Sequence, residues 1–301
     1  MQPLNPNAFT GAPLDRAGHH RRDAAWLAAA LDAADTLILP FHQQQPFVTE
    51  EAGVVAPGWL TAHARTRIAP ADAGTLFLGV NAAGLAHFAI DVADPSRLEG
   101  LGRFDDLRAL GSRLSRDDLA TLGPAKAVFE WHVKNGYCAN CGGPTLVVEA
   151  GWKRECPRCS AEHFPRVDPV CIMVPTFGDK CLLGRQKVWP RGMFSALAGF
   201  IEPGEAIEEA VARETHEEAG LIVKQVTMHS TQPWPFPHSL MIGVLCEVEN
   251  DSETVDTFEL ESVRWFTRDE AKLLIAGKHP DAFAPPSFAI AHQLLKTWSE
   301  G

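Results

Sequence analysis

A short acidic segment carries the residues best suited to chemistry. The glycine-rich residues 199–205 lead into a stretch that ends at Gly220, as expected of a helix with a glycine just past its end. On such a helix Glu214, Glu217 and Glu218 stand at positions i, i+3 and i+4, so their carboxylates share one face and repel one another. Crowded oxygen ligands suit Mg²⁺ or Mn²⁺, which also bind phosphate oxygens. The alternative is a solvated acidic helix face.

Four of the seven cysteines form two C-x-x-C pairs, Cys138 with Cys141 and Cys156 with Cys159. Two such pairs can direct four thiolates at one zinc ion, which leaves no open position for a reaction, so we expect a structural zinc ribbon. Redox C-x-x-C motifs are the alternative, but neither pair precedes a clear helix of a thioredoxin-like unit. Residues 126–168 hold six basic and five acidic side chains, too small an excess for a nucleic-acid module.

A proline-rich segment, residues 231–239, follows the acidic helix. Pro233, Pro235 and Pro237 fix the backbone and remove hydrogen-bond donors, so this segment is expected to be stiff before any ligand binds. A stiff loop loses little entropy on binding, and its side chains could line a nucleotide pocket. On composition alone, a purely structural loop is an equal alternative.

The surrounding chain has the composition of a folded protein. Its 301 residues fit two domains, or two with a small insert, and the 46% of hydrophobic and 22% of charged residues argue against disorder. The formal net charge of -11 disfavours long-range attraction to nucleic-acid backbones or anionic lipid. We find neither the basic and apolar regions of a signal peptide in the first twenty residues nor an apolar run of ~20 residues, so we expect a cytoplasmic protein.

Hydrophobic patterns divide the chain into segments. We expect one helix around Trp26, and a second that begins at a capping box of Ser115 and Asp118 and reaches Asn135. Apolar stretches predict strands at residues 36–41, 75–80, 86–92, 170–175 and 181–184. The expected domains are an amino-terminal α+β domain (1–125), a helix with the zinc ribbon (126–167) and a catalytic domain (168–301).

The complete pattern around the acidic helix is G-x5-E-x7-R-E-x-x-E-E-x-G followed by a hydrophobic residue, and it resembles the signature of the Nudix hydrolases. The resemblance implies a Nudix α/β/α sandwich with a mixed sheet and hydrolysis of a nucleoside diphosphate linked to another moiety. Thr215 departs from the pattern, where the family usually has a bulkier aliphatic residue facing the core. Arg213 and Glu205 resemble a structural pair that orients the helix.

The same resemblance assigns roles to the acidic residues. It implies that Glu214 and Glu218 bind the catalytic divalent ions, with Glu217 beside them as a ligand or general base. The backbone carbonyl of Ala198 and the later carboxylate of Glu259 are expected to complete the metal site and the catalytic set. Water would then attack one phosphorus while the ions, Mg²⁺ or Mn²⁺, neutralise charge on the bridging oxygen.

Residues 231–239 resemble the SQPWPFPxS signature of the NADH pyrophosphatase branch of this family, which also carries a four-cysteine zinc ribbon; residues 163–169 resemble its junction. The branch implies hydrolysis of NADH, and less efficiently of NAD⁺, to AMP and nicotinamide mononucleotide. It also implies a homodimer whose two subunits sandwich adenine between Phe164 and Phe200. The substrate-binding residues implied are Phe164, Phe200, Gln232, Pro233, Trp234, Pro235, Phe236, Pro237, His238, Ser239 and Ala291.

Three other functions stay open at this point. Removal of NAD caps from RNA 5′ ends would break the same bond, and the acidic net charge argues against extensive RNA contacts but not against one bound end. Hydrolysis of other nucleoside diphosphate derivatives would use the same chemistry. A degenerate Nudix fold that only senses nucleotides is opposed by the intact set of four glutamates.

Overall fold

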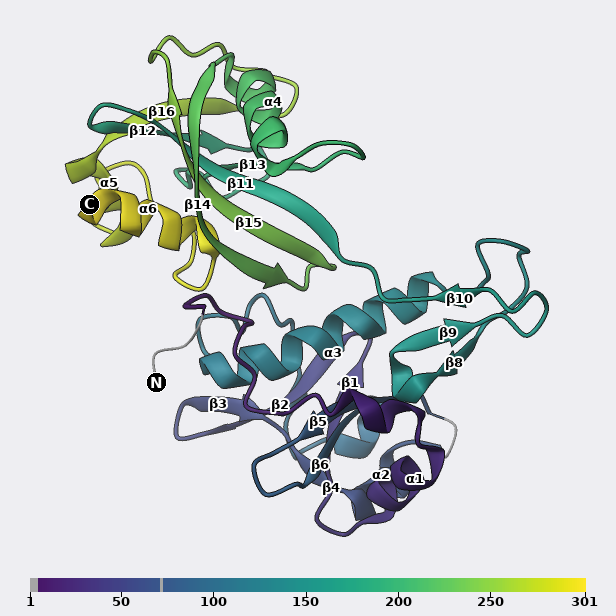
Figure 1. The fold of residues 1–301 in the computed structure, drawn as a ribbon. Helices are drawn as coiled ribbons and strands as arrows, with labels where there is room; N and C mark the ends of the chain where they lie inside the picture. Colours follow the sequence, from purple (N-terminus) through teal and green to yellow (C-terminus); the bar gives the residue numbers. More distant parts are fainter. Residues whose placement is uncertain (1–4, 71–72) are drawn as a thin grey trace. The chain divides into compact units, whose positions relative to one another are not determined.

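The protein is described by a computed structural model that covers residues 5–70 and 73–301. The chain forms two compact units, which we call the amino-terminal unit and the carboxy-terminal unit (Figure 1). Within the described residues, no helix is long and apolar enough to cross a membrane. The amino-terminal unit comprises residues 9–167 and 234–238, and the carboxy-terminal unit comprises residues 5–8, 168–233 and 239–301.

Two short segments depart from the predicted division into consecutive domains. Near the start of the chain, Asn5 and Asn7 donate side-chain hydrogen bonds to the carbonyl of Thr231 at 2.7 and 2.9 Å, which joins this segment to the carboxy-terminal unit. Residues 234–238 belong instead to the amino-terminal unit, because their two aromatic rings pack on Phe9. Long-range contacts of this kind leave no trace in local sequence patterns.

A seven-stranded sheet forms the centre of the amino-terminal unit. Its strands run in the order β3-β2-β1-β6-β5, with β4 beside β1 and β7 beside β2, and the central β1–β6 pair is parallel. The predicted strands of this region are confirmed, within a residue or two at their ends. The bounds are β1 (Leu37–His42), β2 (Gln45–Glu51), β3 (Val54–Pro57), β4 (Leu60–Thr61), β5 (Thr75–Val80), β6 (Ala86–Asp91) and β7 (Arg103–Phe104).

The longest helix of this unit, α3 (Arg116–Lys134), contacts β2 and β5. It begins at the predicted capping box: the Ser115 hydroxyl accepts the Asp118 N–H at 3.1 Å, and the Asp118 carboxylate accepts the Ser115 N–H. The helix runs through residue 125, where the sequence placed a domain boundary, and Leu122, Ala125 and Phe129 continue one buried face across it. The shorter helices are η1 (Gly18–Arg22), α1 (Ala24–Asp32), α2 (Ala62–Ile68) and η2 (Pro95–Leu98).

A small three-stranded antiparallel sheet follows α3 in the same unit. Its strands run in the order β10-β9-β8, and the short helix η3 lies between β8 and β9 in the chain. One cysteine pair lies in the loop between α3 and β8, and the other lies in the loop between β9 and β10. The bounds are β8 (Leu146–Val148), η3 (Glu149–Gly151), β9 (Lys153–Glu155) and β10 (Glu162–His163).

The carboxy-terminal unit has a six-stranded mixed sheet in the order β14-β15-β11-β12-β16, with β13 beside β11. Strands β11 and β15 are parallel, whereas β12 is antiparallel to both β11 and β16. Helix α4 covers one face, and α5 and α6 cover the other (Figure 1). The bounds are β11 (Asp168–Phe177), β12 (Lys180–Arg185), β13 (Leu197–Phe200), α4 (Ile207–Ala219), β14 (Val223–Trp234), β15 (Ser239–Val248), β16 (Ser262–Thr267), α5 (Arg268–Ile275) and α6 (Ile290–Glu300).

Strand β11 explains why both faces of this sheet are covered. Cys171 and Met173 point into the core beneath α4, whereas Ile172 and Val174 point into the core beneath α5 and α6. A strand that is buried on both faces has an uninterrupted apolar sequence, as residues 170–175 do. The predicted α/β/α sandwich with a mixed sheet is therefore confirmed.

Candidate active site and zinc centre

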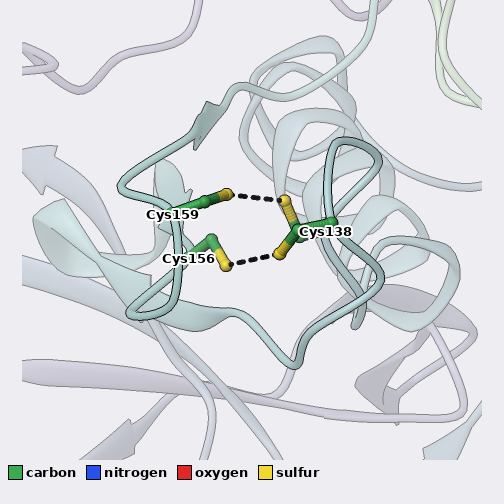
Figure 2. Close-up of side chains that lie close together, drawn as sticks. Cys138, Cys156 and Cys159 are labelled. Atoms are coloured by element: carbon green, nitrogen blue, oxygen red, sulfur yellow. Dashed lines mark hydrogen bonds between the residues drawn. The ribbon is translucent and has the colours of Figure 1, made fainter.

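The four predicted zinc ligands converge on one point. Figure 2 shows the sulfur atoms of three labelled cysteines of this group facing one another across a gap between two loops. The Sγ atoms of Cys138 and Cys159 are 3.6 Å apart, those of Cys141 and Cys156 are 3.5 Å apart, and all four lie within 4.8 Å of one another. Four thiolates on one zinc ion at about 2.3 Å are about 3.8 Å apart, so the cluster fits a closed tetrahedral site.

Two similar backbone turns position these thiolates. The N–H of Gly142 donates to the Cys138 carbonyl at 2.9 Å, and the N–H of Ser160 donates to the Cys156 carbonyl at 2.8 Å. The residue after each pair has a positive φ, +71° at Gly142 and +58° at Ser160. Glycine adopts this conformation freely, whereas a side chain at Ser160 opposes it. The second turn therefore carries backbone strain that the first does not.

Polar neighbours complete the zinc centre. The Nε2 atom of His163 lies 3.4 Å from Cys138 Sγ, and the amide of Asn140 donates to Cys159 Sγ at 3.6 Å. Hydrogen bonds from the Ala161 backbone and from Asn140 lower the pKa of Cys159 to about 6, whereas the neighbouring thiols raise the pKa of Cys141 to about 11. Cys159 is therefore the thiol that most readily supplies the thiolate that zinc requires. Sequence reasoning missed His163 and Asn140; their closeness in sequence to the cysteines was the available signal.

The acidic helix α4 ends as its sequence predicts. Gly220 has a φ of +67° and donates its N–H to the His216 carbonyl at 2.7 Å, which terminates the helix. Thr215 is fully buried, with its hydroxyl 3.9 Å from Cys246 Sγ. The residue that departs from the family pattern therefore faces the core, as predicted.

The three glutamates of α4 have different environments. Glu214 and Glu218 are buried, at 8% and 4% exposed, whereas Glu217 is exposed. The Oε2 atom of Glu218 is buried without a hydrogen-bond partner. Burial, and after it the charges of Glu214 and Glu259, raise the pKa of Glu218 to about 8. A hydrogen bond from the Ala198 backbone acts in the opposite direction and lowers this pKa. A buried carboxylate oxygen without a donor is costly unless a cation neutralises it, so these residues fit a divalent metal ion.

Gly199 makes room for the buried carboxylate of Glu214. A Cβ atom at Gly199 would lie only 1.8 to 2.2 Å from the carboxyl atoms of Glu214, so β13 can pass this close only as glycine. Burial raises the pKa of Glu214, whereas the Arg213 guanidinium lowers it. Sequence reasoning counted Gly199 as part of a motif but did not identify this packing role.

Arg213 connects the loop before α4 to the helix itself. It binds both carboxylate oxygens of Glu205, at 2.6 and 2.9 Å, and these bonds lower the pKa of Glu205 to about 2. The same guanidinium donates to Glu214 at 2.7 Å, to Glu217 at 2.9 Å and to the Phe200 carbonyl at 3.0 Å. The expected pair of Arg213 and Glu205 is therefore present, and it orients the glutamates of α4 as well.

Glu259 lies exposed in the loop between β15 and β16. Its charge acts on Glu214 and on Glu218, raising the pKa of both. Ala198, the other expected ligand, lies on β13 one residue before Gly199. Across the part of the chain that the structure describes, the metal-ligand atoms of the acidic residues do not gather as closely as those of the cysteines.

Gln232, a predicted substrate contact, is fully buried in the carboxy-terminal unit. Its amide group donates to the carbonyls of Ala8 at 3.2 Å and Phe288 at 2.8 Å, and its oxygen accepts the N–H of Ile290 at 2.8 Å. Both amide hydrogens and the oxygen are therefore used inside the protein. We correct the expectation and assign Gln232 a structural role.

The two aromatic residues of the same segment pack within the amino-terminal unit. The ring centroids of Trp234 and Phe236 lie 6.1 and 5.9 Å from that of Phe9. The Arg108 guanidinium lies 4.5 Å from the Phe236 ring centroid, and the Lys126 ammonium lies 5.4 Å from it. Both rings have these neighbours and keep partial exposure, so their part in a nucleotide pocket stays a prediction.

The remaining predicted contacts have mixed environments. Phe164 and Phe200 are 60% and 59% exposed, and they belong to different units. Ala291 is buried in the core beneath α6, and Pro235 is buried in the amino-terminal unit, so neither side chain is open to a ligand. Four other residues of the segment keep full or partial exposure: Pro233, Pro237, His238 and Ser239.

Family models match three successive parts of the chain. Residues 35–131 match the NADH pyrophosphatase-like rudimentary NUDIX domain, and residues 134–164 match the NADH pyrophosphatase zinc ribbon domain. Residues 165–285 match the NUDIX domain. The first match lies largely within the expected amino-terminal α+β domain, in which none of the predicted site residues falls.

Characterised relatives align along most of the chain. NAD-capped RNA hydrolase NUDT12 of Homo sapiens is 36% identical over 97% of this chain and 73% of its own length. Nudix hydrolase 19, chloroplastic, of Arabidopsis thaliana is 31% identical over 98% of this chain and 86% of its own. NAD-capped RNA hydrolase NudC of Mycobacterium bovis is 40% identical over 64% of each chain.

Proposed function

Because the chain belongs to the Nudix hydrolase family, in the branch with an NADH pyrophosphatase zinc ribbon, we propose that it hydrolyses the pyrophosphate bond of NADH. The products are AMP and the corresponding nicotinamide mononucleotide, and NAD⁺ is cleaved less efficiently. One observation carries the proposal: Glu218 is buried with an unpartnered Oε2, on the same helix as the buried carboxylate of Glu214. A purely solvating acidic helix face would keep both carboxylates in water.

Two different metal sites belong to this proposal. Glu214, Glu218 and Glu259, with the carbonyl of Ala198, would hold the catalytic ion, for which we propose Mg²⁺ or Mn²⁺. Such an ion, when bound, polarises water and phosphoryl oxygens and offsets their negative charge. Zinc on the four cysteines would instead stabilise the ribbon, since a closed four-thiolate site has no position for substrate.

Glu217 is the exposed carboxylate of α4, and we propose it as the general base that accepts a proton from the attacking water. Its hydrogen bond to Arg213 at 2.9 Å fixes its orientation, and Glu205 in turn holds Arg213. Glu214 and Glu218 are buried and are proposed to hold metal, so Glu217 is the one that solvent reaches. A general base must first lie within reach of the proton that it accepts, and an exposed, oriented carboxylate can meet that requirement.

We also propose a cytoplasmic homodimer, in which Phe164 of one subunit and Phe200 of the other sandwich adenine. Both rings are about 60% exposed in the single chain, so they are open to stacking. Base stacking contributes about 1 to 3 kcal/mol per base, so Phe164→Ala should lower kcat/KM for NADH by roughly 5-fold to 150-fold. Light scattering tests the dimer, and a monomer with full activity would contradict this arrangement.

A second candidate is removal of NAD caps from RNA. Two of the relatives carry the name NAD-capped RNA hydrolase, and such a cap contains the same pyrophosphate bond. The net charge of -11 disfavours extensive contact with an RNA backbone but permits one bound end. Other nucleoside diphosphate derivatives would use the same site.

Product analysis after incubation with NADH, ADP-ribose and NAD-capped RNA at equal concentrations distinguishes these functions. We expect NADH to be cleaved with a kcat/KM at least tenfold above that for ADP-ribose. Comparable or faster cleavage of ADP-ribose would contradict the assignment to dinucleotides. Cleavage of capped RNA without cleavage of NADH would replace the first candidate by the second.

A further inference from the structure

A cavity of about 230 Å³ lies within the amino-terminal unit. Its walls come from the seven-stranded sheet, from α3 and from the small three-stranded sheet of the zinc ribbon (Figure 1). Pockets for drug-sized ligands span ~300 to 1,000 Å³, so this cavity suits a smaller molecule. None of its lining residues belongs to the metal and substrate sites proposed above. The side chains that give it a distinct chemistry are Gln44, Asp91, Phe129, Val133, Val147 and Arg154.

Arg154 on β9 gives the cavity a positive charge that no carboxylate neutralises. Its Nε donates to the Thr145 hydroxyl at 2.7 Å, and its other nitrogens donate to the Thr145 carbonyl at 3.0 Å and to His132 Nδ1 at 3.1 Å. In the part of the chain that the structure describes, these neutral acceptors are its hydrogen-bond partners. A guanidinium has more N–H groups than these bonds use, so donors remain for a ligand.

His132 holds this guanidinium as a neutral acceptor. Its Nε2 atom lies 2.9 Å from the Gly151 carbonyl, so Nε2 carries the proton and Nδ1 accepts from Arg154. Burial, and after it the charge of Arg154, lower the pKa of His132 to about 4, so the ring stays uncharged at neutral pH. Thr145 and His132 therefore orient the guanidinium without offsetting its charge. An oriented, partly buried guanidinium of this kind is suited to a carboxylate or phosphate group.

A carboxylate and an amide line the same cavity. Asp91, the last residue of β6, is exposed, and it stays apart from Arg154 because no carboxylate pairs with that guanidinium. Gln44 lies in the two-residue turn between β1 and β2, where Gln43 and Gln44 have φ values of +49° and +62°. Such turns favour Asn-Gly, because a positive φ opposes most other side chains. The chain therefore keeps an amide side chain at the cavity at a cost in backbone strain.

The remaining wall of the cavity is apolar. Phe129 is buried, whereas Val133 on α3 and Val147 on β8 are 67% and 43% exposed. A molecule in the cavity would cover part of this open apolar surface, and removal of apolar surface from water favours binding. The cavity thus combines two separate opposite charges with an apolar wall.

We propose that this cavity binds a small zwitterion of the amino-acid class. The carboxylate of the ligand lies on Arg154, and its ammonium group lies toward Asp91. Its apolar side chain packs on Phe129, Val133 and Val147. A phosphate or carboxylate without a positive group would satisfy Arg154 but would be repelled by Asp91, which favours a ligand that carries both charges. The site is independent of the proposed hydrolysis, because none of these residues is assigned to metal or dinucleotide.

The test is calorimetric titration of the full-length, zinc-loaded protein with each of the common apolar amino acids. At least one of them should bind with a Kd of about 1 mM or lower. Its N-acetyl derivative lacks the ammonium group, and its amide lacks the carboxylate. Each derivative should bind at least about tenfold more weakly, because each loses one charged contact.

Variants then assign the binding to this cavity. Arg154→Gln should weaken binding of the amino acid about tenfold or more. Asp91→Asn should remove the preference for the amino acid over its N-acetyl derivative. Val147→Phe should weaken binding by filling the cavity. Arg113→Gln, at an arginine of the same unit that pairs with Glu50 outside the cavity, is the matched control and should change nothing.

Absence of binding by every amino acid of the panel would overturn the inference, and so would binding that none of the three cavity variants weakens. Equal affinity for the amino acid and its N-acetyl derivative would overturn the assignment to a zwitterion. Asp91→Asn and Val147→Phe leave the hydrogen bonds of Arg154 in place, so they decide the question even if Arg154→Gln fails to fold. Hydrolysis of NADH, measured on the same preparations, should be unaffected by Asp91→Asn.

Discussion

Glu218→Gln is expected to make the protein more stable at alkaline pH when no Mg²⁺ or Mn²⁺ is present, although it removes a proposed metal ligand. The pKa of Glu218 is about 8 in the folded chain, against an ordinary value of 4.5. Because the folded-state pKa is the higher one, the unfolded chain loses this proton first as the pH rises. The free energy of unfolding therefore falls as the pH rises between these two values, and levels off above the higher one.

The difference between these pKa values corresponds to roughly 5 kcal/mol, at about 1.4 kcal/mol per pKa unit. Burial is the largest cause of this energy, and repulsion by the charges of Glu214, Glu259 and Glu217 contributes to the rest. We therefore expect the free energy of unfolding of Glu218→Gln to be higher than that of the unaltered protein by about 2 to 5 kcal/mol at about pH 9. Glutamine has the same size and stays neutral, so this penalty is absent in the variant.

Urea unfolding at about pH 5, 7 and 9, with zinc retained and Mg²⁺ and Mn²⁺ removed, measures the effect. The two proteins should have nearly equal stability at the lowest pH and diverge as the pH rises. Glu217→Gln removes the smallest of the charges that raise the pKa of Glu218, so its stability should stay closer to that of the unaltered protein than to that of Glu218→Gln. Adding Mn²⁺ should stabilise the unaltered protein more than Glu218→Gln. A difference that does not depend on pH, or a less stable variant at the highest pH, would refute the reasoning.

Three further predictions concern the zinc centre and the packed aromatic residues. Cys156→Ser should abolish binding of the one zinc ion expected per chain and lower the thermal unfolding midpoint. Elemental analysis that finds the same zinc content in the variant would refute the four-cysteine site. Ser160→Gly should stabilise the protein by about 0.5 to 1 kcal/mol, because Ser160 has a φ of +58°. Gly142→Ala should destabilise the matching turn for the same reason. Equal thermal unfolding midpoints for both variants and the unaltered protein would show that neither turn is strained. A double-mutant cycle of Arg108→Ala and Phe236→Leu should give a coupling energy of at least about 0.5 kcal/mol in unfolding, and purely additive effects would refute the cation–π contact.

Features set by neighbours in sequence could be predicted. The capping box of Ser115, the glycine that ends α4 at Gly220 and the convergence of the cysteines each depend on spacing over a few residues. The continuous apolar run of β11 likewise indicates burial on both faces. The α/β/α fold and the zinc ribbon were therefore accessible from the sequence.

Features set by distant partners could not be predicted. Gln232 resembles a pocket residue in sequence, yet Ala8, Phe288 and Ile290 use its polar atoms. The rings of Trp234 and Phe236 likewise contact residues more than 100 positions away. The unequal burial of the three glutamates on α4 depends on how β13 and the loop before β16 pack against the helix. Periodicity alone placed them on one face without distinguishing them.

The most direct test of the proposed activity is the identification of the products of NADH hydrolysis with and without the divalent ion. The account predicts AMP and reduced nicotinamide mononucleotide in equal amounts with Mg²⁺ or Mn²⁺, and turnover lower by on the order of 10²-fold or more in Glu218→Gln. No turnover of NADH, release of free nicotinamide with ADP-ribose, or full turnover by Glu218→Gln would contradict it.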